Sequence, residues 1–295
     1  MRKDCALRNA ATIGVVCLGA AVPLHAQTSD GATEPGMFSL QSGIWQADPG
    51  LAQDAASADA TELEESWEIS GPIFLRSADP EPPGEVVVKN IFGWETTKGG
   101  GNSDWEYELE IEWGVVEHHE FIFEVPFELG DGRVEGNGDI TLGYHWRLWK
   151  EEGDWPAFAM RQFVRLPSGY HSSGVDYEWR GLFTRTLIPD TMRLHFNPFV
   201  KWINGDNEEE ARSFRFGGAL GVDYRLSADL LLIGDYIYSS GELEDTRDNH
   251  TAELGVDWKI DERQKLGVAA EIGLDGDENG PSFGAKISYM LSFGG

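Results

Sequence analysis

The feature that most constrains this chain is an alternation of apolar and polar residues, which recurs in short segments from about residue 85 to the C-terminus. It is clearest over residues 282–293. One face there carries Phe283, Ala285, Ile287, Tyr289, Leu291 and Phe293, and the other carries Gly284, Lys286, Ser288, Met290 and Ser292. Successive side chains of a strand point to opposite faces, so this segment predicts a strand with one apolar face and one mostly polar face.

About twelve segments have the length that a tilted membrane strand requires, roughly 9–11 residues. Their expected bounds are 85–95, 104–115, 119–128, 138–149, 156–166, 176–187, 192–203, 212–225, 229–239, 249–260, 264–275 and 282–293. The connections after even-numbered segments are mostly short, and those after odd-numbered segments are longer and mostly rich in glycine or acidic residues. Short periplasmic turns, long outer loops and an even strand number are typical of bacterial outer-membrane barrels. Residues 85–295 therefore predict an all-β fold, a transmembrane antiparallel up-and-down β-barrel of about 12 strands.

The large aromatic residues support this arrangement because they fall into two bands. Near the expected periplasmic strand ends the outward positions hold Trp113, Trp146, Tyr224 and Trp258, and near the opposite ends they hold Trp94, Trp105, Trp179, Trp202 and Tyr238. Amphipathic rings gather at the two interfaces of a membrane. A soluble β-sandwich is the alternative, but one core does not explain two bands at opposite strand ends.

Residues 1–26 predict a secretory signal peptide. Arg2, Lys3 and Arg8 form a basic start, residues 10–22 form a short apolar run, and a cleavage site precedes Gln27. Both cysteines, Cys5 and Cys17, lie in this segment, so the mature protein is expected to have no disulfide, no thiolate metal site and no cysteine nucleophile. No later run is long and apolar enough for a membrane helix.

Residues 27–84 differ from the rest, since they are acidic and lack sustained alternation. Arg76 is their only basic residue, and Thr61 to Glu64 fits a capping box for a short helix near 62–68. We expect a largely irregular periplasmic extension, with partial insertion into the lumen as a plug as the alternative. The whole chain has 23 Lys and Arg against 51 Asp and Glu, a net charge of −28, which argues against a nucleic-acid partner.

The expected inward positions are charged. The predicted lumen-lining residues are Glu106, Glu108, Glu110, Glu112, Glu124, Asp139, His145, Arg147, Arg161, Arg165, Arg180, Arg193, His195, Lys201, Arg215 and Arg225. In one interpretation, acidic strands facing basic strands create a transverse field in a water-filled channel. In the other, Glu–Arg pairs fill a narrow lumen and lock it. A twelve-stranded barrel is intermediate in width, so the alternation leaves both open.

No motif predicts a catalytic residue, a cofactor or a specific metal site. Residues 275–280 resemble the start of a calcium loop, but Lys286 stands where the last ligand is required. Loose binding of divalent cations by acidic loops such as 206–210 remains an expectation. An outer-membrane lipid hydrolase requires an outward Ser and His near the outer rim, whereas His145 and His195 are expected to face inward.

Several short stretches resemble a known family, the outer-membrane barrels catalogued as the MetA-pathway of phenol degradation. They are residues 136–146 (GNGDITLGYHW), 165–169 (RLPSG), 113–116 (WGVV) and Val125-Pro126. The resemblance covers about 85–293 and implies a transporter-like outer-membrane barrel that passes small, aromatic or hydrophobic solutes. One departure is that Phe293 is followed by Gly294 and Gly295, whereas such barrels usually end on an aromatic residue read by the barrel-insertion machinery.

The sequence thus predicts export through a cleaved signal peptide to the cell outer membrane, contact with lipid and glycolipid, and passage of a small-molecule solute. The alternative is a closed structural or adhesive barrel that binds cations or glycolipid through its acidic loops.

Overall fold

The computed structural model describes residues 68–97, 103–129, 136–169, 172–204, 212–275 and 281–294. The predicted signal peptide, most of the acidic extension and the loop at 206–210 lie outside these ranges, as does the predicted helix near 62–68 except for Glu68. No helix within the described ranges is long and apolar enough to cross a membrane.

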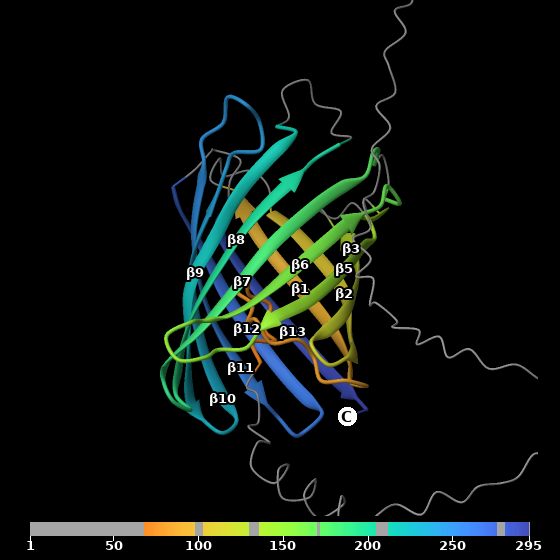
Figure 1. The fold of residues 1–295 in the computed structure, drawn as a ribbon. Helices are drawn as coiled ribbons and strands as arrows, with labels where there is room; N and C mark the ends of the chain where they lie inside the picture. Colours follow the sequence, from red (N-terminus) through yellow and green to blue (C-terminus); the bar gives the residue numbers. More distant parts are fainter. Residues whose placement is uncertain are drawn as a thin grey trace, which may run out of the picture. The chain divides into compact units, whose positions relative to one another are not determined.

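The described chain is built from strands. They are β1 (Val86–Thr97), β2 (Ser103–Val116), β3 (His119–Glu128), β4 (Gly136–Asn137), β5 (Thr141–Trp149), β6 (Ala157–Arg165), β7 (Asp176–Ile188), β8 (Met192–Trp202), β9 (Phe214–Ser227), β10 (Leu230–Ser239), β11 (Asn249–Lys259), β12 (Gln264–Asp275) and β13 (Pro281–Phe293). Every pairing is antiparallel, and β1 pairs with both β2 and β13, which closes the sheet (Figure 1). The two-residue β4 pairs only with the end of β3, so the wall has twelve long strands.

The predicted fold class is confirmed. With one exception, the expected strand bounds agree with the observed bounds to within two residues. The exception is the segment expected at 138–149, whose strand begins only at Thr141. The Asp139 carboxylate accepts hydrogen bonds from the backbone of Ser168 and Gly169, at 3.1 and 2.9 Å, so this stretch braces an outer loop instead of extending the strand.

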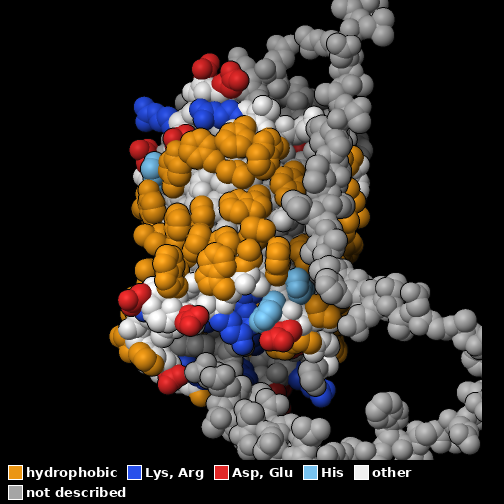
Figure 2. Space-filling model, viewed as in Figure 1, with side chains coloured by type: hydrophobic (Ala, Val, Ile, Leu, Met, Phe, Trp, Pro, Cys, Tyr) orange, Lys and Arg blue, Asp and Glu red, His pale blue; other side chains and the backbone are white. Residues whose placement is uncertain are grey.

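The outer surface is apolar at the middle of the strands. In β13, the mid-strand Ile287 is 46 % exposed, whereas the inward Ser288 and Met290 are buried. Figure 2 shows a band of hydrophobic side chains around the visible face, with charged side chains above and below it. Water-soluble proteins rarely expose an apolar patch larger than a few hundred Å². The band is therefore the surface that hydrocarbon covers in a transmembrane barrel.

The aromatic residues lie at the two edges of this band. Trp113, Trp146 and Trp258 are exposed near the strand ends beside the short turns, and Trp105 and Trp202 are exposed near the long-loop ends. A short turn joins β2 to β3, where His118 adopts a φ of 72°. Because short turns and the start of β1 share one end, that end corresponds to the periplasmic side of an outer-membrane barrel.

Candidate functional site: the barrel lumen

Residues 68–82 run through the interior of the barrel, and we call this segment the inner strap. Figure 1 shows it in orange within the lower part of the barrel. Its backbone N–H groups donate to side chains of the wall: Ser70 (3.0 Å) and Gly71 (2.8 Å) to Asp257, Phe74 to Glu253 (2.7 Å), Arg76 to Asn197 (2.7 Å), Ala78 to Thr184 (2.8 Å) and Glu81 to Glu120 (2.8 Å). These acceptors stand on β11, β8, β7 and β3, so the strap crosses the lumen from one wall to the other.

Apolar contacts hold the same segment. Ile69, Ile73 and Leu75 of the strap are almost completely buried, and they form one cluster with Ala219, Leu231 and Ile233 of β9 and β10. Further along, Ala78 packs with small residues and a leucine of β6 and β7. The apolar core of this protein therefore lies inside the barrel, between the strap and the wall, and stabilises the strap in place.

The strap leaves the lumen in close contact with the end of β2. The N–H of Gly84 donates to the carbonyl of Gly114 at 2.7 Å. A Cβ atom at position 114 would lie 2.0 Å from the carbonyl oxygen of Pro82, so only glycine permits this approach.

The lower part of the lumen also contains a buried ionic network beside the strap. Lys89 of β1 is fully buried, with Nζ 3.1 Å from Glu110 Oε1 and in contact with Glu112. Arg161 of β6 bridges Glu112 (3.0 Å) and Glu120 (3.1 Å). Charges buried in this way are stable only when paired, so the network fixes the positions of β1, β2, β3 and β6.

The two predicted histidines are structural members of such networks. His145 Nδ1 accepts a hydrogen bond from Arg161 Nε at 3.2 Å, which requires this nitrogen to be unprotonated because guanidinium can only donate. His195 places Nε2 3.1 Å from Asp223 and Nδ1 3.0 Å from the Thr184 hydroxyl. Both rings are buried and face inward, away from lipid.

Two of the predicted arginines form ion pairs with Asp79 of the strap. Arg147 Nη1 lies 2.6 Å from the Asp79 carboxylate, and Arg193 Nη1 lies 3.8 Å from it. Arg193 is also paired with the buried Asp223, with its Nε 3.0 Å from Oδ2. A charged side chain of the strap is therefore tied to β5 and, through Arg193, to β8 and β9.

Above the strap, a third cluster joins aromatic and charged groups. Glu178 accepts hydrogen bonds from Arg180 at 2.6 Å and pairs with Lys201 at 2.9 Å. The Arg180 guanidinium lies over the Phe74 ring, 4.2 Å from its centre, and the Phe199 ring packs 5.6 Å from the same ring. Phe74 thus gives the strap an aromatic upper surface that a cation already covers on one side.

A half-open cavity of about 400 Å³ lies on the long-loop side of the strap, and we call it the vestibule. The strap residues Ile73 and Phe74 form part of its floor, and the predicted lumen residues Glu106 and Glu108 form part of its wall. A second cavity of about 160 Å³ is lined by Glu124, Arg165, Arg180, Lys201 and other residues at the outer end. The outer half of the barrel therefore contains free volume of the size of a small solute, lined by charged and apolar side chains.

The remaining predicted residues lie at the rims. Arg215 pairs with Glu242 of an outer loop at 3.0 Å, and Asp139 braces the loop after β6. Arg225 lies at the short-turn end of β9, where its N–H donates to the Thr191 carbonyl at 2.8 Å. The role of the whole predicted set in solute passage stays a prediction.

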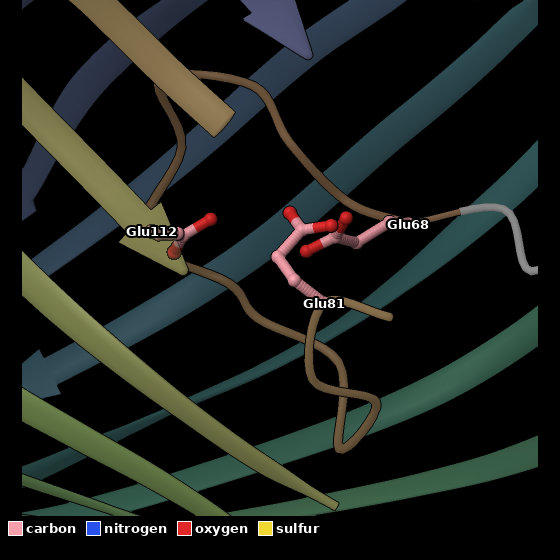
Figure 3. Close-up of side chains that lie close together, drawn as sticks. All are labelled: Glu68, Glu81 and Glu112. Carbon is pink, nitrogen blue, oxygen red and sulfur yellow. The ribbon is translucent and has the colours of Figure 1, made fainter. Parts of the chain in front are cut away.

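Three carboxylates meet where the strap faces β2. Glu68, Glu81 and Glu112 each place one oxygen within 4.8 Å of the others (Figure 3). Glu81 precedes the first strand, and burial, followed by the neighbouring Glu68 carboxylate, raises its pKa well above the ordinary value. Because Glu112 already pairs with Lys89 and Arg161, we interpret the contact between Glu68 and Glu81 as a shared proton rather than a metal site.

Sequence reasoning missed several residues that the structure makes central. Lys89, Asp223, Glu253 and Asp257 all occupy inward positions, and the alternation along their strands was a signal that could have revealed them. The lumen is accordingly more mixed in charge than an acidic wall facing a basic wall. The same alternation applies to Asn197, which binds the strap backbone, because it lies on one face of its strand with the predicted inward residues His195 and Lys201.

Together the closed sheet, the apolar outer band and the charged interior define the class of this protein as a twelve-stranded transmembrane barrel with an internal strap. No family model matches the sequence, and no curated protein sequence matches it, so membership of the phenol-degradation family stays a prediction. The chain is similar in structure to the COG4313 outer membrane channel from Pseudomonas putida F1, at 14 % identity and a TM-score of 0.58, over 73 % of this chain and 98 % of that one. It is also similar to the NanC porin, at 9 % identity and a TM-score of 0.53, over 69 % and 98 % of the two chains. At these identities the similarity establishes the fold.

Proposed function

We propose that this protein is an outer-membrane channel for a small solute, and that the inner strap closes the periplasmic half of its lumen at rest. The observation that carries the proposal is the vestibule, a cavity of about 400 Å³ lined by both charged and apolar side chains, inside a barrel whose outside faces lipid. The similarity to a channel and to a porin supports it at the level of the fold. Export by a cleaved signal peptide and insertion into the outer membrane belong to the same proposal.

Purified full-length protein in planar bilayers provides the test. We expect low resting conductance and discrete opening events. A solute can pass only when the strap breaks some of its hydrogen bonds to the wall and moves aside. A variant with weakened anchors, such as Asn197→Ala with Asp257→Ala, is expected to open more often. Absence of any conductance in both proteins, with folding shown by resistance to protease, contradicts the proposal.

A closed structural barrel is the second candidate, and the extent of strap anchoring favours it. The six backbone hydrogen bonds and the buried cluster on β9 and β10 are features of a resident plug. The two candidates predict opposite outcomes for the weakened-anchor variant. If the variant loses strap protection from protease but still conducts nothing, the structural candidate is correct.

We propose a non-enzymatic role. A lipid hydrolase requires an outward Ser–His pair near the outer rim. Within the described ranges, the outward histidine at that height is His250, and its Nδ1 is bonded to the Tyr236 hydroxyl instead of to a serine. Passage of an aromatic or hydrophobic solute, which the family resemblance implies, is tested by uptake assays with such compounds.

A further inference from the structure

The acidic ladder of β2 divides into two halves at the level of the strap. Glu110 and Glu112, in the lower half, are paired with Lys89 and Arg161. Glu106 and Glu108, in the upper half, make no ion pair with any residue in the described part of the chain. Both line the vestibule, so their charges face its free volume.

The vestibule is lined by three cations, and two of them are paired with carboxylates. Lys286 lies 3.9 Å from Glu253 and 3.8 Å from Glu271, and Lys201 pairs with Glu178 at 2.9 Å. The Arg76 guanidinium turns back onto its own strap and donates to the Leu75 carbonyl at 3.0 Å. The lining as a whole holds five carboxylates, Glu95, Glu106, Glu108, Glu253 and Glu271, against these three cations, so the net charge of the cavity is negative, which disfavours an anionic solute.

The rest of the cavity surface is apolar where the strap meets the wall. Ile73 and Phe74 of the strap and Ile91, Phe199 and Ile237 of the wall contribute to it. The contact of Arg180 with Phe74 shows that this floor accepts a cation against an aromatic ring. A ligand that fills the vestibule thus meets carboxylates on one side and aliphatic and aromatic carbon on the other.

We propose that the vestibule binds organic cations with an apolar body, such as alkyl- or arylammonium ions. The ammonium group lies against Glu106 and Glu108, and the hydrocarbon part packs on Phe74 and Phe199. This inference deepens the proposed channel function, since it names the class of solute that the outer half of the lumen selects. An anion is repelled by the same carboxylates, and a neutral analogue leaves them without a counter-charge.

Three probes of the same shape test this assignment: 2-phenylethylammonium, 2-phenylethanol and 3-phenylpropionate. Binding to full-length protein in a non-ionic detergent is measured by calorimetry at about pH 8, where the amine is charged and carboxylates are ordinarily ionised. We expect the ammonium ion to bind at least about tenfold more tightly than the alcohol, and the carboxylate to show no binding. Ammonium itself and ethylammonium, which lack the apolar body, are expected to bind more weakly than 2-phenylethylammonium.

The double variant Glu106→Gln/Glu108→Gln is expected to lose about tenfold or more in affinity for 2-phenylethylammonium. The matched control is Glu117→Gln/Glu262→Gln, which removes two acidic groups from the short turns and is expected to bind as the wild type does. Equal affinity for the three probes, or equal loss in both variants, overturns the assignment. Binding of plain ammonium as tight as that of the aryl probe overturns the apolar part of it.

Bilayer recordings separate this inference from the channel proposal. If the protein conducts but 2-phenylethylammonium neither blocks nor permeates better than the alcohol, the solute class is wrong and the channel stands. If the protein binds the ammonium ion with the expected selectivity but never conducts, the solute class stands and the channel proposal fails.

Discussion

Replacing Asn197 by alanine tests whether the strap is a separately moving element. The Asn197 side chain forms two hydrogen bonds with the backbone of Arg76, accepting from its N–H at 2.7 Å and donating to its carbonyl at 3.1 Å. At about 1 kcal/mol for each bond, their loss weakens docking by about 2 kcal/mol. We therefore expect the displaced state of the strap to become about thirtyfold more populated.

Trypsin measures this population directly. Arg76 is the only Lys or Arg between residues 27 and 84, so a cut in this part of the chain reports exposure of the strap alone. When the strap returns faster than it is cut, the cleavage rate follows the displaced population. Asn90→Ala is the matched control, because Asn90 stands next to the inward Lys89, faces the outside of the barrel and accepts a hydrogen bond from the Tyr107 hydroxyl. Equal cleavage at Arg76 in the two variants refutes the reasoning.

Three further perturbations follow from the same contacts. Gly114→Ala places a methyl group 2.0 Å from the carbonyl oxygen of Pro82. We expect it to lower the unfolding free energy by about 1–3 kcal/mol in urea titrations. The control Gly234→Ala, whose methyl group would lie 3.7 Å from the nearest atom, is expected to be close to neutral. Arg193→Met leaves the buried Asp223 carboxylate without its guanidinium partner, and we expect it to lower the unfolding free energy by about 3–5 kcal/mol in the same assay. Burial raises the folded-state pKa of Glu81, so its contribution to docking is present at low pH and is lost as pH rises through that pKa. Cleavage at Arg76, corrected for the activity of trypsin on a free peptide, is therefore expected to accelerate as pH rises, and Glu81→Gln is expected to flatten this dependence.

The alternation along β2 and β13 was sufficient to predict the barrel because lipid imposes one rule on every strand. An outward Ile287 and an inward Lys286 leave no choice of register, since a slip by one residue puts the charge into hydrocarbon. The interior follows no comparable rule. An inward carboxylate such as Asp257 can accept hydrogen bonds from water, pair with a cation or accept from a backbone N–H. The sequence does not show which of these partners it has.

The conformation of residues 68–82 explains why their sequence does not predict where they lie. The strap forms no ladder with the wall, so it needs neither alternation nor helical periodicity. The wall side chains that accept from its backbone N–H groups lie between 39 and 187 residues away along the chain. Only the closed barrel brings Asp257 and Glu120 to opposite sides of the same segment.

The width of the barrel gives a physical reason for the strap and for the acidic interior together. Eight strands leave an interior that side chains can fill, whereas twelve enclose a wider gap, which in this protein also holds the strap. A chain segment that fills this gap brings backbone N–H groups with it, and each must find an acceptor because a buried unpaired donor is costly. Inward Asp, Glu, Asn and Thr residues provide those acceptors in the lower half of the lumen. On the long-loop side of the strap, β2 places two further carboxylates in the lumen, those of Glu106 and Glu108. No strap backbone and no cation in the described ranges pairs with them, so they are available to bind a solute.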